Sequence, residues 1–111
     1  MTTVKLSKYQ QKVLDEAKKK IDRARNCKTV YEYLKEVRYL SDEKINSLEN
    51  NNLEILEIYA NTWNNEKNAV VIVNSNIKTI QKLERLGYIK IIEISKDRSR
   101  IIIDTVQVLN Y

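Results

Sequence analysis

The sequence contains no histidine, no proline and no phenylalanine, and it has only one glycine, one cysteine and one tryptophan. Without histidine, and with a single thiol, the chain lacks the ligands of nearly every zinc or copper site. It also lacks the usual general base of a nucleophile–base pair. No Asp/Glu group has the spacing of a calcium loop or a magnesium site. These absences argue against an enzyme and against a metal or other cofactor.

Two further absences bear on where the protein works. Cys27 has no second cysteine to pair with, which suits a reducing compartment. No apolar run approaches the roughly 20 residues that a membrane span needs, and the opening MTTVKLSKYQ lacks the apolar segment of a secretory signal. We therefore expect a cytoplasmic protein that does not enter a membrane.

Charge is abundant but unevenly placed. Residues 1–40 hold 11 Lys/Arg against 5 Asp/Glu, residues 41–69 hold 2 against 6, and residues 70–111 hold 7 against 4. Basic ends around an acidic middle favour an anionic ligand or head-to-tail contact between copies. A solvated surface with chance asymmetry is the simpler alternative.

The single glycine marks the best-defined part of the chain. Gly87 follows the helical run Ile77, Ile80, Leu83 and Leu86, where a left-handed C-terminal cap is favoured. Residues 88–95 and 100–109 then read as two strands around the polar turn 96–99. The apolar phase changes between Ile91 and Ile92, which predicts a bulge or burial on both faces.

The first 65 residues predict helices. Ser7 with Gln10, and Thr29 with Glu32, have capping-box spacing, and the second pair opens a helix over 30–40. Ser41 caps a third helix, which Asn50–Asn52 break or bend. The resumed pattern predicts a core-facing or partner-facing stripe, and residues 64–68 read as a loop. The stripe consists of Leu53, Leu56, Ala60 and Trp63.

A short apolar run at residues 69–73 reads as a strand covered on both faces, because it does not alternate. The whole pattern predicts one α+β domain over residues 1–111. Helices occupy about 7–65, and a β-α-β-β unit with a small antiparallel sheet occupies about 69–109. Apolar residues on both faces of the ribbon favour a homo-oligomer.

Residues 83–89, LERLGYI, resemble the end of a recognition helix that enters the wing of a winged helix-turn-helix protein. In this alternative, the chain is a DNA-binding phage regulator with Lys96, Arg98 and Arg100 on the wing, and the basic pI fits contact with a DNA backbone. A helix must directly precede a recognition helix, and here the apolar strand stands in that place.

A second resemblance covers nearly the whole chain except residues 39–68. It rests on KLSKYQQKVLDEAKKKIDRAR at 5–25, NSNIKTIQKLERLGYIKII at 74–92 and IDTVQVLNY at 103–111. These stretches resemble a family of small proteins from phages and prophages of Firmicutes, close to the first type of Thoeris anti-defence protein. The resemblance implies an oligomeric, non-enzymatic protein in the host cytoplasm. It would sequester cyclic ADP-ribose signals, and cyclic oligonucleotides in some members. A phage inhibitor that binds a host protein is a third reading.

Such a sponge needs cations or N–H groups for phosphate, an aromatic plate for a base and polar groups for ribose. Arg25 and Lys28 are the phosphate candidates, and Asn74 and Asn76 stand at a predicted helix start, where free N–H groups point outward. Trp63 is a candidate for stacking on adenine, with core packing as the alternative. Arg98 and Arg100 are expected to close the site from a neighbouring subunit.

Overall fold

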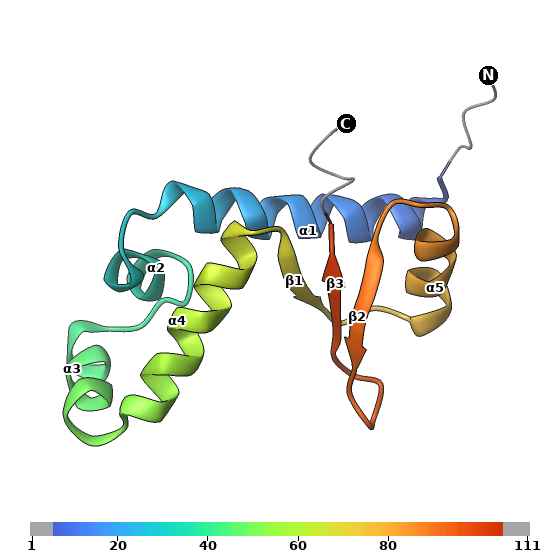
Figure 1. Cartoon of the computed structure of the whole chain (residues 1–111). Coiled ribbons are helices and arrows are strands. Elements are labelled where there is room, and N and C mark those ends of the chain that lie inside the picture. Colours follow the sequence, from blue (N-terminus) through green and yellow to red (C-terminus); the bar gives the residue numbers. More distant parts are fainter. Residues whose placement is uncertain (1–5, 106–111) are drawn as a thin grey trace.

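The computed structural model describes residues 6–105, which form five helices and one three-stranded antiparallel sheet. This confirms the predicted α+β class with the helices leading (Figure 1). The elements in chain order are α1 (Lys8–Asn26), α2 (Val30–Glu36), α3 (Asp42–Asn51), α4 (Leu53–Lys67), β1 (Val70–Val73), α5 (Ile77–Arg85), β2 (Lys90–Ile94) and β3 (Ile101–Asp104).

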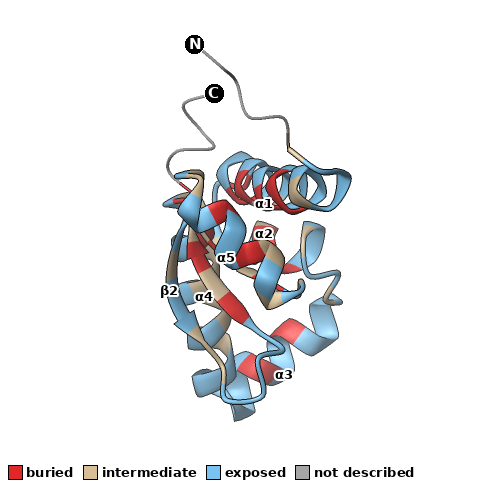
Figure 2. Ribbon diagram, turned by 90° about the vertical axis from the view of Figure 1, so that its right-hand side faces the viewer, coloured by how far each residue is buried: buried red, intermediate tan, exposed pale blue. Residues whose placement is uncertain are grey.

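Helix α1 is the element that both halves of the molecule share. It starts at the predicted capping box, in which Ser7 Oγ accepts from the Gln10 N–H and Gln10 Oε1 accepts from the Ser7 N–H. In Figure 1 it runs along the top, with α2, α3 and α4 below one end and the sheet with α5 below the other. Figure 2 shows its buried residues in red among exposed ones in blue, as one-sided packing requires.

Helix α2 is shorter than predicted. It ends at Glu36 instead of residue 40, and Tyr39 has a positive φ of 58°, which a helix does not tolerate. Only half of its predicted capping box forms. Thr29 Oγ1 accepts from the Glu32 N–H, but Glu32 Oε2 accepts from the N–H of Lys28, one residue before the cap.

The predicted break after α3 is confirmed at Asn52, whose φ of −154° and ψ of 67° leave the helical region. The predicted loop at 64–68 was wrong, because α4 continues as far as Lys67. Of the stripe predicted to face a core or a partner helix, Leu56 and Trp63 pack against buried residues, whereas Leu53 is 65% exposed in the single chain. The spacing of apolar residues identifies the apolar face of a helix only approximately. Tertiary packing decides which residues at the margins of that face are buried.

The sheet has the order β1-β3-β2, with both neighbouring pairs antiparallel. Its strands are shorter than predicted, and the predicted β3 residues 106–109 lie outside the described part of the chain. The predicted bulge is confirmed between Ile91 and Glu93. The expectation that β1 is covered on both faces was wrong, since Val71 and Val73 are buried while Val70 and Ile72 are only half-buried.

Gly87 ends α5 as predicted, with a φ of +86°. The Gly87 N–H donates to the Glu84 carbonyl and the Tyr88 N–H donates to the Leu83 carbonyl, the two bonds of a Schellman motif. This cap turns the chain directly from α5 into β2.

Residues 6–105 contain two hydrophobic clusters. The sheet cluster joins the first part of α1 to α5 and the sheet, and the helical cluster joins the last turn of α1 to α2, α3 and α4. The boundary between them falls near Ile21 and Ala24 on α1. Within residues 6–105, no helix combines the length and apolarity that crossing a bilayer requires.

Candidate functional site

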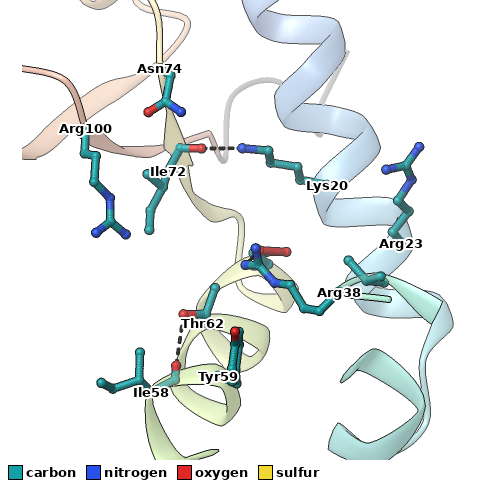
Figure 3. A pocket seen from close by; sticks show the side chains of 11 residues that line it. Lys20, Arg23, Arg38, Ile58, Tyr59, Thr62, Ile72, Asn74 and Arg100 are labelled. Atoms are coloured by element: carbon teal, nitrogen blue, oxygen red, sulfur yellow. Dashed lines mark hydrogen bonds and ion pairs between the residues drawn. The ribbon is translucent and has the colours of Figure 1, made fainter. Parts of the chain in front are cut away.

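A groove of about 410 Å³ lies where the two halves meet beneath α1 (Figure 3). Side chains from α1, α4 and β1 line it, together with residues that directly follow α2 and β1 and the residue that precedes β3. Its volume falls in the range of roughly 300–1,000 Å³ that small-molecule sites occupy. The groove is therefore the candidate site.

Four cations line this groove. Lys20 and Arg23 come from α1, Arg38 follows α2, and Arg100 precedes β3. In Figure 3, Arg100 lies across the groove from Lys20 and Arg23. Only one carboxylate, Glu66, stands among the lining residues. This excess of positive charge in a concave site favours an anionic ligand.

Within the described residues, the four cations differ in how they are held. Lys20 Nζ donates to the Ile72 carbonyl at 2.5 Å, which ties α1 to β1. Arg38 is held by the polar network described below. Within residues 6–105, no hydrogen bond or ion pair holds the guanidinium groups of Arg23 and Arg100, and Arg100 is bonded only through its backbone to Ser95. Both guanidinium groups therefore keep their donors free for a phosphate.

Arg38 is positioned by two partners from the helical half. Its Nε donates to Tyr33 Oη at 3.0 Å, and its Nη2 lies 3.3 Å from Glu66 Oε1. Tyr33 Oη in turn donates to the same Oε1 at 2.9 Å. The guanidinium carbon also lies 6.0 Å from the ring centroid of Tyr59, another lining residue. This network fixes one edge of the guanidinium and leaves the other edge available.

Glu66 is the buried member of the network, with its side chain only 7% exposed. Burial raises the pKa of the Glu66 carboxyl, while the Tyr33 hydrogen bond and the charges of Arg38 and Lys20 oppose the rise. Burial also raises the pKa of the Tyr33 hydroxyl, and Glu66 adds to that effect. The second carboxylate oxygen, Glu66 Oε2, is buried without a hydrogen-bond partner in the described residues.

The remaining lining residues supply an aromatic ring, apolar contacts and neutral polar groups. Tyr59, Ile58 and Thr62 come from α4, and Asn74 follows β1. Thr62 Oγ1 donates to the Ile58 carbonyl at 2.9 Å, so its hydroxyl is already engaged. Figure 3 shows Asn74 beside Ile72, on the Arg100 side of the groove.

Two of the predicted site residues line the groove, namely Asn74 and Arg100. Arg98, the third candidate on the ribbon side, stands at the hairpin turn with a φ of 59° and is not among the lining residues. Asp97 orders this turn by accepting from both Ser95 Oγ and Ser99 Oγ, and these hydrogen bonds lower its pKa to about 2.

The predicted phosphate candidates Arg25 and Lys28 lie away from the groove lining. Arg25 Nε donates to the Lys67 carbonyl at 2.9 Å, a contact that joins the end of α1 to the end of α4. Lys28 is exposed, and its backbone N–H donates to Glu32 Oε2. Arg25 thus has a structural partner in this fold.

Trp63 and Asn76 also have local partners. The Trp63 indole N–H donates to the Ala24 carbonyl at 2.9 Å and its ring packs on the helical cluster, so its surroundings match the core alternative. Lys67 Nζ lies 3.6 Å from the indole centroid. Asn76 Oδ1 accepts from the Lys78 N–H, which makes it the N-cap of α5.

Sequence reasoning missed Lys20, Arg23, Arg38, Tyr59 and Glu66. Lys20 and Arg23 are three residues apart on α1, a spacing that puts them on one face of the helix. Arg38 and Glu66 meet only through the packing of α2 against α4, so no local pattern identifies them. Glu66 fell within the wrongly predicted loop.

A second, shallower hollow of about 240 Å³ adjoins the groove and shares Ile72 and Arg100 with it. Glu93, Ser95 and Ile102 complete its lining. It lies on the sheet face opposite the sheet cluster, because Ile72 pairs with Ile102 and neither side chain belongs to that cluster. The groove is therefore open along this sheet face.

No family model, curated protein or solved structure matches this chain. Among the described residues, no three His, Cys, Asp or Glu side chains come together in a way that could hold a metal ion.

Proposed function

We propose that this chain is a phage anti-defence protein that binds cyclic ADP-ribose-type immune signals in the host cytoplasm and sequesters them without hydrolysis. Cyclic oligonucleotides are the second ligand class in this proposal. The observation that carries it is the convergence of four cations, an aromatic ring and an asparagine on one groove of nucleotide size.

Each part of a nucleotide has a matching group. Arg23, Arg38 and Arg100 offer the planar donors that suit phosphate oxygens. The Tyr59 ring supplies a flat apolar surface for a base, and Asn74 offers both a donor and an acceptor for ribose. Two of these groups, Arg23 and Asn74, lie in the stretches that resemble the anti-defence family.

Sequestration without chemistry is the mode that these residues support. The chain has no histidine, and the one buried carboxylate of the groove is engaged by Tyr33 and Arg38. Arg38 is held for binding by its contacts to Tyr33 and Glu66. A pre-positioned cation lowers the entropic cost of binding a phosphate.

We further propose that the protein acts as a homo-oligomer. The open sheet face, with Ile92 53% exposed and Ile72 and Ile102 half-buried, offers apolar surface that a second copy would cover. A copy seated there would close the groove along the side where Arg100 lies.

The winged-helix alternative has less support from the geometry. Strand β1 directly precedes α5, in the place where a helix-turn-helix requires its first helix. The discriminating measurement is salt dependence. DNA binding through backbone contacts should fall steeply between 50 and 200 mM salt, whereas a small ligand in the groove should respond much less. A phage inhibitor would instead capture a host protein without a small ligand.

Calorimetry of the purified protein with glycocyclic ADP-ribose and with cyclic trinucleotides tests the proposal. We expect saturable heat with at least one of them, and release of the unaltered ligand after heat denaturation. Absence of heat with all of them would overturn the proposed function. Release of a cleaved ligand would instead show that the protein is an enzyme.

A further inference from the structure

Glu66 has a feature that the phosphate-binding groups do not explain. Its side chain is more than nine-tenths buried and lines the groove, yet Oε2 has no hydrogen-bond partner within residues 6–105. A buried carboxylate oxygen without a partner costs free energy, because its desolvation is not compensated. A glutamine would fill the same space without a buried charge.

The Arg38 contact is the weakest link around this carboxylate. Arg38 Nη2 lies 3.3 Å from Oε1, whereas Tyr33 Oη donates to the same oxygen at 2.9 Å. The Arg38 side chain is 38% exposed, so its outer edge reaches solvent. The terminal torsion of a glutamate side chain is broad, so its carboxylate turns at little cost.

These geometries allow an exchange of partners on binding. A ligand phosphate offers Arg38 Nη2 a charged acceptor, and the hydrogen bond to it can be shorter and stronger than the long contact to Glu66. The Arg38 Nε bond to Tyr33 Oη can persist, so the guanidinium stays in place. The carboxylate that Arg38 uncovers then accepts a hydrogen bond from a neutral donor of the same ligand.

We propose that Glu66 is the residue that reads a ribose hydroxyl next to the phosphate that Arg38 binds. This inference rests on the proposed function and specifies its ligand. The two protein groups are only 3.3 Å apart, so the ligand groups that they contact must also be close together. A ribose hydroxyl lies a few bonds from a phosphate, whereas the adenine amino group lies beyond the whole sugar. A carboxylate on a ribose hydroxyl is also the pairing that dinucleotide-binding folds use.

The negative charge of Glu66 adds selectivity. A carboxylate beside Arg38 repels a second phosphate at that point and accepts only a donor. Compounds that carry phosphate without hydroxyls should therefore gain nothing from Glu66.

The test compares two probes on three forms of the full chain. Glycocyclic ADP-ribose carries ribose hydroxyls next to phosphate, and pyrophosphate carries none. The proteins are wild type, Glu66→Gln and the control Glu93→Gln, which removes an exposed carboxylate that lines only the adjoining hollow. In Glu66→Gln, we expect the amide oxygen to keep the Tyr33 contact while the NH₂ group faces the ligand as a second donor.

We expect Glu66→Gln to lower the affinity for glycocyclic ADP-ribose by about 10- to 100-fold, the usual loss when a hydrogen bond to a charged group is removed. Its affinity for pyrophosphate should be unchanged or higher, and Glu93→Gln should match wild type with both probes. Retained pyrophosphate binding and an unchanged melting temperature show that Glu66→Gln is folded.

Equal affinity of wild type and Glu66→Gln for glycocyclic ADP-ribose would overturn this inference and leave the proposed function standing. An equal loss for both probes would also overturn it, because it would show a general effect on the groove. Failure of the wild-type protein to bind glycocyclic ADP-ribose would overturn the inference, and the further failure of every cyclic nucleotide would overturn the proposed function as well.

Discussion

The two halves of this molecule are built from different kinds of core. The sheet cluster consists only of aliphatic residues, with Ile101 and Ile103 fully buried between the sheet and the helices. The helical cluster is smaller and has Tyr33 at its centre, hydrogen-bonded to the buried Glu66. The core of the first half is apolar, whereas the core of the second also contains a hydrogen-bonded polar network.

This difference explains where the candidate site lies. Apolar side chains stabilise the fold but offer little to an anionic ligand, so the polar side chains that the sheet half contributes to the groove are Asn74 and Arg100, which lie at its edge. In the helical half, Arg38 is positioned by its contacts to Tyr33 and Glu66, which belong to the polar network of the core. α1 belongs to both halves and carries Lys20 and Arg23 at their boundary. Binding and folding are therefore coupled in the helical half and nearly separate in the sheet half.

The largest effect is expected in the sheet cluster. Ile103→Ala removes a fully buried side chain, and we expect it to lower the free energy of unfolding by about 2–5 kcal/mol. Urea unfolding provides the measurement. The control is Leu53→Ala on α4, which is 65% exposed and should change stability by less than about 0.5 kcal/mol. Equal losses would show that the sheet is not packed as described.

A smaller effect is expected from the polar network. Tyr33→Phe removes the donor to Glu66 Oε1 and the acceptor of Arg38 Nε, and should cost about 1–3 kcal/mol in unfolding free energy. Tyr9→Phe is the control, because Tyr9 is 75% exposed. A Tyr33→Phe protein as stable as wild type would mean that the helical core is held by apolar packing, like the sheet core.

The turn between α5 and β2 should respond to backbone conformation alone. Gly87→Ala places a Cβ where no atom lies within 4 Å, at a φ of +86°. Gly87→Ala should lower the free energy of unfolding by about 1–2 kcal/mol, because a left-handed conformation is unfavourable for a residue with a Cβ. Thermal unfolding measures it, and Gly87→Asn should lose less, because asparagine tolerates this region better. A loss that is equal for both variants would contradict this account.

The smallest effect is a pH dependence confined to the helical half. Burial raises the pKa of Glu66 above its ordinary value of 4.5, so the folded chain keeps this proton where the unfolded chain has lost it. Its contribution to stability should therefore fall as pH rises from about 4.5. The difference in unfolding free energy between wild type and Glu66→Gln should shift against wild type over that range. If the difference in unfolding free energy between wild type and Glu66→Gln does not change from pH 4 to 8, the pKa of Glu66 is not raised.

The sequence predicted features that depend on a few neighbouring residues. The Ser7 capping box, the break at Asn52, the Gly87 cap and the bulge after Ile91 are set by residues within one or two turns, and all four were confirmed. The α+β class followed from these signals. The predicted helix ends were wrong where local signals were weak, as for the end of α2 near Tyr39.

The candidate site could be predicted only in part, because it is assembled by tertiary packing. Arg23 and Arg25 stand two residues apart on α1, which turns them about 200° from one another around the helix. Arg23 faces the groove, while Arg25 donates to the Lys67 carbonyl. Composition and the family resemblance favoured Arg25, and only the position of α4 distinguishes the two residues.

On the proposed function, the groove between the two halves binds the ligand phosphate. The most direct measurement is the affinity of glycocyclic ADP-ribose for Arg100→Gln and Arg98→Gln, which remove the same charge two residues apart on one hairpin. We predict a loss of about 10- to 100-fold for Arg100→Gln, and an affinity within about threefold of wild type for Arg98→Gln, as for an exposed charge. Equal affinities for the two variants would contradict the claim.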